Sequence, residues 1–296
     1  MHNYYEVTTI DSLIESVEKS INNPNYDSAY QKKLEDFLKN KIKKEYGNIP
    51  VVHAKYPIKI YLIKKYNKKG INEILEEDKL HYNNKEFANI FEEKSRLQTK
   101  SKKYFLISIE YPNGNPVLIV GVPDGLNLEG NRIKIYEVKS FNLDDFIQSA
   151  KEMKEYSLIK KISNQIEISS HQLISYQYLL KRTQEFGLIR KPDVINLYGE
   201  IYLYSGNKGY LIWAIETIRQ DLNTIKIFAK EYSAYNLSLK DYLSLGYGGT
   251  ININNKEIYY LKIGFRVTYS LKIVKYYLKN LDEIIKSLNY VDNRNL

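Results

Sequence analysis

The chain of 296 residues contains no cysteine. This absence excludes disulfides, thiolate nucleophiles and cysteine-ligated zinc or iron–sulfur sites, and it fits a reducing compartment. No apolar run approaches the roughly 18 residues of a membrane span. Residues 1–11 are polar and lack the apolar core of a signal peptide. We therefore expect a cytoplasmic protein that does not contact membranes.

Tryptophan is nearly absent, with a single residue, whereas tyrosine occurs 29 times. A tyrosine packs an apolar ring, keeps a hydroxyl for hydrogen bonding and can stack on a nucleic-acid base. Hydrophobic residues make up 43% of the chain, which is enough for a buried core and argues against global disorder. We expect core and surface packing to account for most of the tyrosines.

The net charge of +9 is concentrated in one stretch. Residues 31–70 contain 12 lysines and 3 acidic residues, and the remaining 32 basic and 32 acidic residues balance. Such a stretch is typical of a protein that binds a polyanion such as nucleic acid. The alternative is a solvated helix face followed by a lysine-rich loop.

The apolar pattern predicts a mixed α and β fold around a central sheet, without internal repeats. Turns are predicted at residues 112–116 and 127–131, and a hairpin turn at 205–208. We interpret the glycines at 246, 248 and 249 as a flexible loop. The predicted helices are 10–21, 26–46, 85–97, 142–161, 169–186 and 271–288. The predicted strands are 51–66, 104–111, 117–122, 132–140, 195–204, 209–215, 224–228 and 257–268.

The most informative segment joins the second and third strands of a predicted antiparallel meander. The second strand ends in Pro123-Asp124, and the third contains Glu137-Val138-Lys139. Because side chains alternate faces along a strand, Glu137 and Lys139 share one largely apolar face. Burial there is costly unless the charges pair or bind a cation. We expect the meander to bring Asp124 beside Glu137.

Two carboxylates and a lysine at one sheet edge suit phosphodiester hydrolysis. Carboxylate oxygens are the ligands that Mg²⁺ or Mn²⁺ prefers, and such a metal polarises the phosphate and lowers the pKa of a bound water. The lysine can orient or help deprotonate that water and offset charge in the transition state. The alternative is a turn aspartate and a surface ion pair. The pattern leaves the number of metal ions open.

Pro123-Asp124 and Glu137-Val138-Lys139 resemble the two halves of the PD-(D/E)XK nuclease motif. Gln172 and Tyr176 share one helix face and are similar to the Q-x-x-x-Y motif of RecB-like nucleases, the group that includes the CRISPR-associated RecB-like exonucleases. Gly121 with Asp124 matches their G-x-x-D. The resemblance covers residues 85–215 and fits cysteine-free relatives from archaeal viruses, which would place this chain in the host cytoplasm.

The resemblance implies an α/β restriction-endonuclease-like core with a mixed central sheet flanked by helices, and it implies several site residues. Asp124, Glu137 and the Val138 carbonyl would bind metal, Gln172 would support the active site, and Tyr176 would lie along the DNA path. The family also has an upstream metal residue, for which Glu93 is preferred over His81 and Glu92.

We expect an N-terminal basic extension at 1–84, a nuclease core at 85–235 and a C-terminal extension at 236–296. The expected function is metal-dependent DNA cleavage in replication, recombination, repair or defence, with the oligomeric state left open. A site-specific or junction-resolving endonuclease and a non-catalytic nucleic-acid-binding scaffold are the alternatives. His53 is interpreted as a core or surface histidine. His171 is interpreted as a helix-surface residue that could contact substrate.

Overall fold

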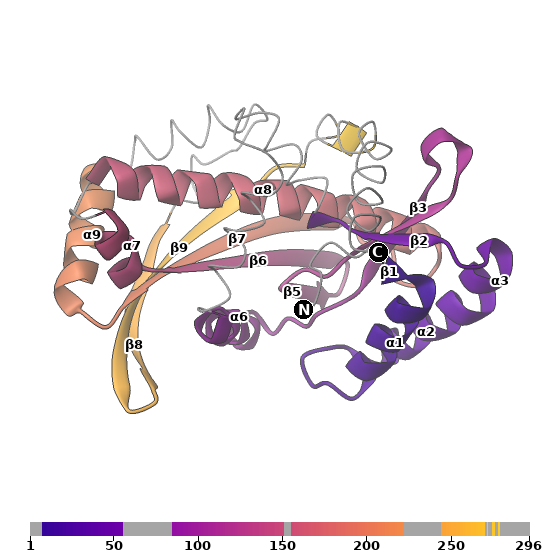
Figure 1. Cartoon of the computed structure of the whole chain (residues 1–296), viewed down its shortest axis with the longest axis horizontal. Helices are drawn as coiled ribbons and strands as arrows, with labels where there is room; N and C mark the ends of the chain where they lie inside the picture. The colour runs from indigo at the N-terminus through magenta and orange to yellow at the C-terminus, as the bar shows by residue number, and fades with distance from the viewer. Residues whose placement is uncertain are drawn as a thin grey trace, which may run out of the picture.

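The chain folds as an α/β protein with two mixed sheets and flanking helices (Figure 1). The computed structural model describes residues 8–55, 85–150, 155–221 and 244–269, together with positions 271, 274, 275 and 278. The predicted strand 224–228, most of the predicted strand 51–66 and most of the final helix lie outside the described residues. None of the described helices combines the length and apolarity needed to cross a membrane.

A four-stranded sheet has the order β1-β2-β4-β3. Its strands are β1 (Thr8–Thr9), β2 (Pro50–His53), β4 (Val117–Gly121) and β3 (Leu106–Glu110). Strands β2 and β4 are parallel, and the other two pairs are antiparallel. The segment expected to form an N-terminal extension therefore supplies two strands to this sheet.

A five-stranded sheet has the order β5-β6-β7-β9-β8. Its strands are β5 (Gly125–Glu129), β6 (Arg132–Asn142), β7 (Val194–Ser205), β9 (Lys256–Val267) and β8 (Ser244–Ile253). Only β6 and β7 are parallel, and the chain between them forms helices α7 and α8. The antiparallel pairing of β5 with β6 places the start of β5 beside the middle of β6, with Gly125 opposite Tyr136.

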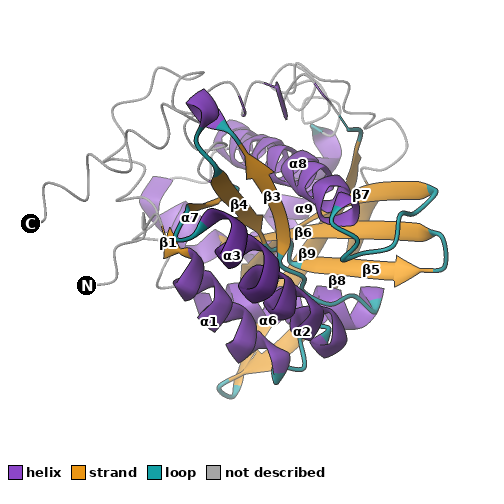
Figure 2. Ribbon diagram, turned by 90° about the vertical axis from the view of Figure 1, so that its right-hand side faces the viewer, coloured by secondary structure: helices purple, strands orange, loops and turns teal. Residues whose placement is uncertain are grey.

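Helices cover both faces of the larger sheet (Figures 1 and 2). The long helix α8 (Glu155–Glu185) lies across both sheets on one face, and α6 (Lys85–Thr99) packs on β5 and β6 from the other. Helices α7 (Leu143–Ala150) and α9 (Lys208–Gln220) lie at one end of the molecule. At the other end lies the N-terminal helical unit, formed by α1 (Ile10–Ile21), α2 (Ser28–Phe37), the π-helix η1 (Leu38–Ile42) and α3 (Lys43–Tyr46).

Two groups of buried side chains hold these layers together. The larger group joins α8, the N-terminal helices and both sheets, and includes Leu34, Leu118, Ile135 and Leu180. The smaller lies under α6, where Phe91 stacks on Tyr202 with ring centroids 4.7 Å apart. Because α6 is fixed by this aromatic contact, its polar face has a defined position relative to β6.

The predicted meander is wrong in its last step. Residues 127–129 belong to strand β5 rather than to a turn, and the turn is only residues 130–131. It is β5, and not β4, that pairs with β6. The sequence did not predict this strand because the polar residue Asn127 interrupts its apolar pattern. In the structure its side-chain amide donates to the carbonyl of Thr99 at 2.7 Å, which satisfies it inside the fold.

The predicted hairpin around residues 205–208 is also wrong, because residues 208–220 form helix α9. The Asn207 side chain accepts a hydrogen bond from the Gly209 N–H at 2.8 Å, so the polar segment caps a helix instead of turning a hairpin. A short apolar run such as 210–215 does not distinguish a strand from a buried helix. The glycines at 246, 248 and 249, interpreted as a loop, lie in strand β8 around an irregularity in its register.

The predicted helices 10–21, 26–46 and 85–97 are found, while the predicted helix 142–161 is divided between α7 and the start of α8. Helix α1 is confirmed at both ends, and the predicted helix 26–46 is found as α2, η1 and α3. The predicted break between 161 and 169 is absent, because α8 runs through it. Ser163 and Ser170 donate to the carbonyls of Ile159 and Ile166, four residues earlier, which satisfies their hydroxyls inside a buried helix.

Candidate functional site

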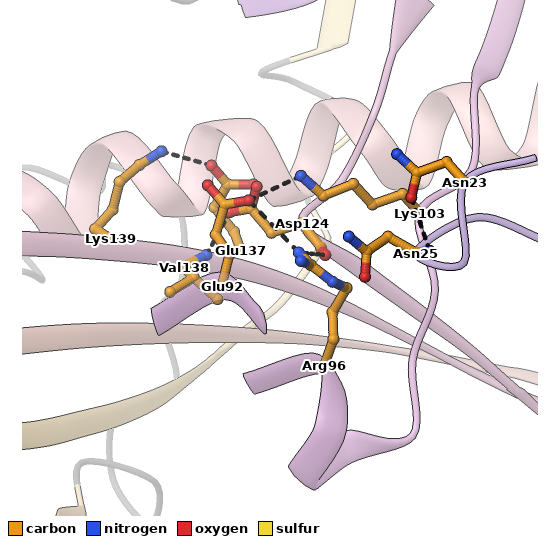
Figure 3. Close-up of polar contacts among 9 residues, drawn as sticks. All are labelled: Asn23, Asn25, Glu92, Arg96, Lys103, Asp124, Glu137, Val138 and Lys139. Carbon is orange, nitrogen blue, oxygen red and sulfur yellow. Dashed lines mark hydrogen bonds and ion pairs between the residues drawn. The ribbon is translucent and has the colours of Figure 1, made fainter. Parts of the chain in front are cut away.

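Asp124 and Glu137 meet where the two sheets diverge. Asp124 lies in the short link between β4 and β5, and Glu137 lies in the middle of β6. The Val138 N–H donates to Asp124 Oδ2 at 2.7 Å, which fixes the aspartate against β6 (Figure 3). The predicted proximity of the two carboxylates is confirmed, although the strand that pairs with β6 is β5 and not β4.

Glu137 and Lys139 form an ion pair beneath the surface. Lys139 Nζ lies 2.6 Å from Glu137 Oε1, and the Glu137 side chain is only 3% exposed. The alternative of a surface ion pair is therefore excluded. Glu137 Oε2 is also buried and has no hydrogen-bond partner among the described residues. A buried anionic oxygen without a hydrogen-bond donor is costly inside a protein unless a cation compensates it, so this atom is a candidate metal ligand.

Both carboxylates lie in surroundings that disfavour their charged forms. Burial raises the pKa of Asp124 well above its ordinary value, and the negative charges of Glu137 and Glu92 raise it further. Burial also raises the pKa of Glu137, although Lys139 opposes that shift. A cation placed among these oxygens would relieve the repulsion and favour both ionised forms.

Lys139 remains an ammonium ion. Burial alone would lower the pKa of its amine, but the carboxylates of Glu137 and Asp124 outweigh burial and raise that pKa above its ordinary value. A lysine that stays protonated cannot take a proton from water. Of the roles considered for Lys139, the structure therefore favours orientation of a nucleophile and stabilisation of negative charge.

A third carboxylate reaches the site from α6, and it belongs to Glu92. Figure 3 shows the Glu92 side chain extending to the carboxylates of Asp124 and Glu137. Glu93, preferred from the sequence, is exposed on the helix surface. Successive helical residues point about 100° apart, so only one of the two can face the sheet. The geometry favours Glu92 over Glu93, and His81 lies outside the described residues.

Two further cations, which the sequence analysis did not single out, hold Glu92. Lys103 Nζ lies 2.8 Å from Glu92 Oε2, and Arg96 Nη1 lies 3.5 Å from the same oxygen. Arg96 also donates to the backbone carbonyl of Asp124 at 3.3 Å. The spacing of Glu92 and Arg96, four residues apart on a helix, was a usable signal. An isolated β-bridge to Tyr26 brings Lys103 to the site, and such a long-range contact leaves no local pattern in the sequence.

Helix α8 brings Gln172 and Tyr176 to the same place, as the motif predicts. Burial raises the pKa of the Tyr176 hydroxyl well above its ordinary value, with Glu137 and Asp124 adding to the shift and a hydrogen bond from Gln172 opposing it. These neighbours put the hydroxyl within the carboxylate cluster. Tyr176 is only 4% exposed, so its ring offers no face for stacking along a DNA path.

Gly121 explains how α8 comes so close to the site. A β-carbon at this position would lie 2.7 Å from Leu179 Cδ1 and 3.0 Å from Tyr176 Cε1. Only glycine leaves room for the helix against the end of β4. The first glycine of the G-x-x-D pattern therefore has a packing role that supports the aspartate three residues later.

Lys55 is a further basic residue at the site that the sequence analysis did not single out. It follows β2, whose register with β4 continues through the Ala54 N–H and the Val120 carbonyl at 2.8 Å. Lys55 therefore emerges beside the strand end that leads to Asp124. Burial lowers the pKa of its amine, and the positive charge of Lys139 lowers it further.

Part of the basic stretch is occupied by contacts within the protein. Lys39 pairs with Glu18 and Glu35, and Lys43 pairs with Asp11. The pairs with Glu18 and Asp11 join α1 to η1 and α3, so some of these lysines stabilise the fold. Lys32, Lys41 and Lys44 are exposed on the same unit, and residues 56–70 lie outside the described part of the chain.

His171 is buried in α8, where its imidazole Nε2 lies 3.8 Å from Glu167 Oε1. Its predicted position on the helix surface is therefore wrong.

The residues that could hold a divalent cation are Asp124 and Glu137. Among the described residues, no group of three or more His, Asp or Glu side chains has the arrangement of a metal site. The unpartnered Glu137 oxygen and the hard oxygen donors nevertheless fit Mg²⁺ or Mn²⁺. The Val138 carbonyl also faces this side, because the N–H and C=O of one strand residue point to the same edge.

No protein-family model, curated protein or solved structure matches the chain.

Proposed function

We propose that this protein is a metal-dependent deoxyribonuclease of the PD-(D/E)XK type, related to the RecB-like group. The observation that carries the proposal is the convergence of five motif residues from three separate segments. Asp124 comes from the β4–β5 link, Glu137 and Lys139 come from β6, and Gln172 and Tyr176 come from α8. A chance occurrence of the sequence patterns would not require the three segments to meet.

The order of elements also supports the proposal. The aspartate precedes a strand that pairs antiparallel with the Glu-x-Lys strand, and the next long helix leads to a parallel strand. This order agrees with the restriction-endonuclease-like core that the resemblance implies. Helix α6 precedes it and contributes Glu92 (Figure 3).

Each residue has a role that follows from its surroundings. Asp124 and Glu137 bind the cation, with the Val138 carbonyl as a third oxygen donor. A bound Mg²⁺ or Mn²⁺ would supply Lewis-acid activation of the phosphate. Lys139, which stays protonated, holds the attacking oxygen and balances the charge that develops on the phosphoryl group. The Tyr176 hydroxyl lies beside the carboxylates of Glu137 and Asp124 and stays protonated.

The substrate is a polyanion. Lys139 and Lys55 place two positive charges at the edge of the carboxylate cluster, where a phosphate would lie between them. Lys32, Lys41 and Lys44 extend the basic character over the surface of the N-terminal helical unit. Phosphate contacts of this kind are independent of base sequence.

An Asp124→Ala variant tests the assigned roles. We expect it to lose cleavage of linear and closed circular DNA by at least about a hundredfold, since it removes a metal ligand, while its DNA affinity is retained. Comparing the products from the two substrates separates an exonuclease from an endonuclease, including a site-specific one. Full cleavage by the variant would contradict the assignment. Wild-type DNA binding without cleavage in any metal would favour the scaffold alternative.

A further inference from the structure

The Glu92 carboxylate is already engaged by two cations. Lys103 and Arg96 both approach its Oε2 atom, at 2.8 and 3.5 Å. The Lys103 side chain is 22% exposed and that of Arg96 is 8% exposed, so solvent screens these contacts little. The backbone N–H of Lys103 also donates to the Asn25 carbonyl at 2.8 Å, which anchors this lysine to the loop between α1 and α2 (Figure 3).

Cations already surround the carboxylate cluster before any metal is added. Arg96, Lys103 and Lys139 lie beside Glu92 and Glu137, and Lys55 lies next to Lys139. One divalent ion would add two positive charges, which a phosphate diester and a hydroxide ion neutralise. A second divalent ion would add two more positive charges to a partly buried site that already holds these cations, which is unfavourable.

We propose that the site binds one divalent cation through Asp124 and Glu137, and that Lys103 and Arg96, held by Glu92, are built-in cations that disfavour a second ion. Glu92 then acts as a positioning residue for two built-in cations, and it is not a metal ligand. This inference rests on the proposed function, and it assigns the residues that set the metal stoichiometry of the site.

Calorimetric titration of the full-length protein with Mn²⁺ and with Ca²⁺ tests this without any need for turnover. We expect one ion per wild-type chain. Lys103→Met removes one positive charge beside Glu92, so we expect divalent affinity to rise at least about tenfold or a second ion to bind. Lys102→Met is the matched control, because Lys102 is the exposed neighbour of Lys103 and should leave affinity unchanged.

A double variant distinguishes the positioning role of Glu92 from that of a ligand. Glu92→Gln together with Lys103→Met keeps the net charge of the wild-type cluster, so we expect the affinity and stoichiometry of the wild type. If Glu92 were a ligand, the double variant would lose most of its affinity, which would overturn the inference. Two ions bound per wild-type chain would also overturn it and leave the proposed nuclease intact. No binding by the folded wild type would contradict the proposed function itself.

Discussion

Asp124 is a carboxylate placed where its charge is unfavourable until a cation arrives. Its pKa is raised by burial and by its two acidic neighbours, while its Oδ2 atom accepts the Val138 N–H. An asparagine keeps an oxygen for that hydrogen bond and removes the charge. We therefore expect Asp124→Asn to melt a few degrees above the wild type in EDTA at pH 8, although it loses metal binding.

The pH dependence of this stabilisation follows from the direction of the pKa shift. The native state holds a proton on Asp124 at pH values where the unfolded chain has released it, so wild-type stability increases as pH falls through the raised folded pKa and below it. The advantage of the asparagine variant should shrink over the same range. Calorimetric melting between pH 8 and pH 5 checks this, and an advantage that is constant or grows on acidification would contradict the explanation.

Tyr176 tests whether α8 contributes to chemistry or only to packing. Tyr176→Phe keeps the ring against Gly121 and removes the hydroxyl beside Glu137 and Asp124. We expect turnover to fall by about tenfold or more, with little change in DNA affinity. Tyr178→Phe is the control, because its hydroxyl donates to Glu110 on β3, outside the cluster. Equal losses in both variants would indicate a packing effect.

Among the elements, those with strong local signals were predictable and those that depend on distant partners were not. Helix α1 and strand β9 follow directly from their periodicity. Strand β5 could not be predicted, because its polar Asn127 is satisfied by distant backbone, the carbonyls of Thr99 and Lys100 at the end of α6. Helix α9 was mistaken for a strand because its short apolar run fits either structure, and its cap resembles a turn.

The close contact between α8 and β4 can be tested at Gly121. In Gly121→Ala, the new methyl group would collide with Leu179 and Tyr176, so we expect a loss of about 1–3 kcal/mol in the free energy of unfolding. Gly206→Ala is the control, since its nearest contact, Asp144 Oδ2, would lie at an ordinary 3.7 Å. Urea denaturation of both variants measures the difference. A Gly121→Ala variant as stable as the wild type would show that α8 can move away without cost.

At the scale of the whole molecule, the excess charge was visible in the sequence but its distribution was not. The structure divides the described lysines of the N-terminal helical unit into those paired with acids, such as Lys39 and Lys43, and those that remain exposed. The site itself was predicted for Asp124, Glu137, Lys139, Gln172 and Tyr176. Lys103 and Lys55 were not predicted, because long-range contacts with no local pattern bring them to the site, whereas the helical spacing of Arg96 from Glu92 was a signal that could have found Arg96.

The exposed lysines give a quantitative prediction for DNA binding. Replacing Lys32 and Lys44 with glutamine should weaken binding of all DNA sequences alike and reduce the slope of log K against log salt by about 0.7–0.9 per lost contact. Lys19→Gln is the control, because Lys19 pairs with Glu15 on the exposed face of α1. Fluorescence anisotropy at several salt concentrations provides the measurement. An unchanged slope in the double variant would place the DNA elsewhere.

The most direct test of the central claim is an incubation of purified protein with end-labelled single- and double-stranded DNA in Mg²⁺, Mn²⁺ or EDTA, with Lys139→Ala alongside the wild type. Lys134→Ala is the control on the same strand, where Lys134 pairs with Glu129 at a distance of 2.8 Å. We expect cleavage only with metal, its loss in Lys139→Ala and its retention in Lys134→Ala. Cleavage that persists in EDTA, or at the wild-type rate in Lys139→Ala, would contradict the account.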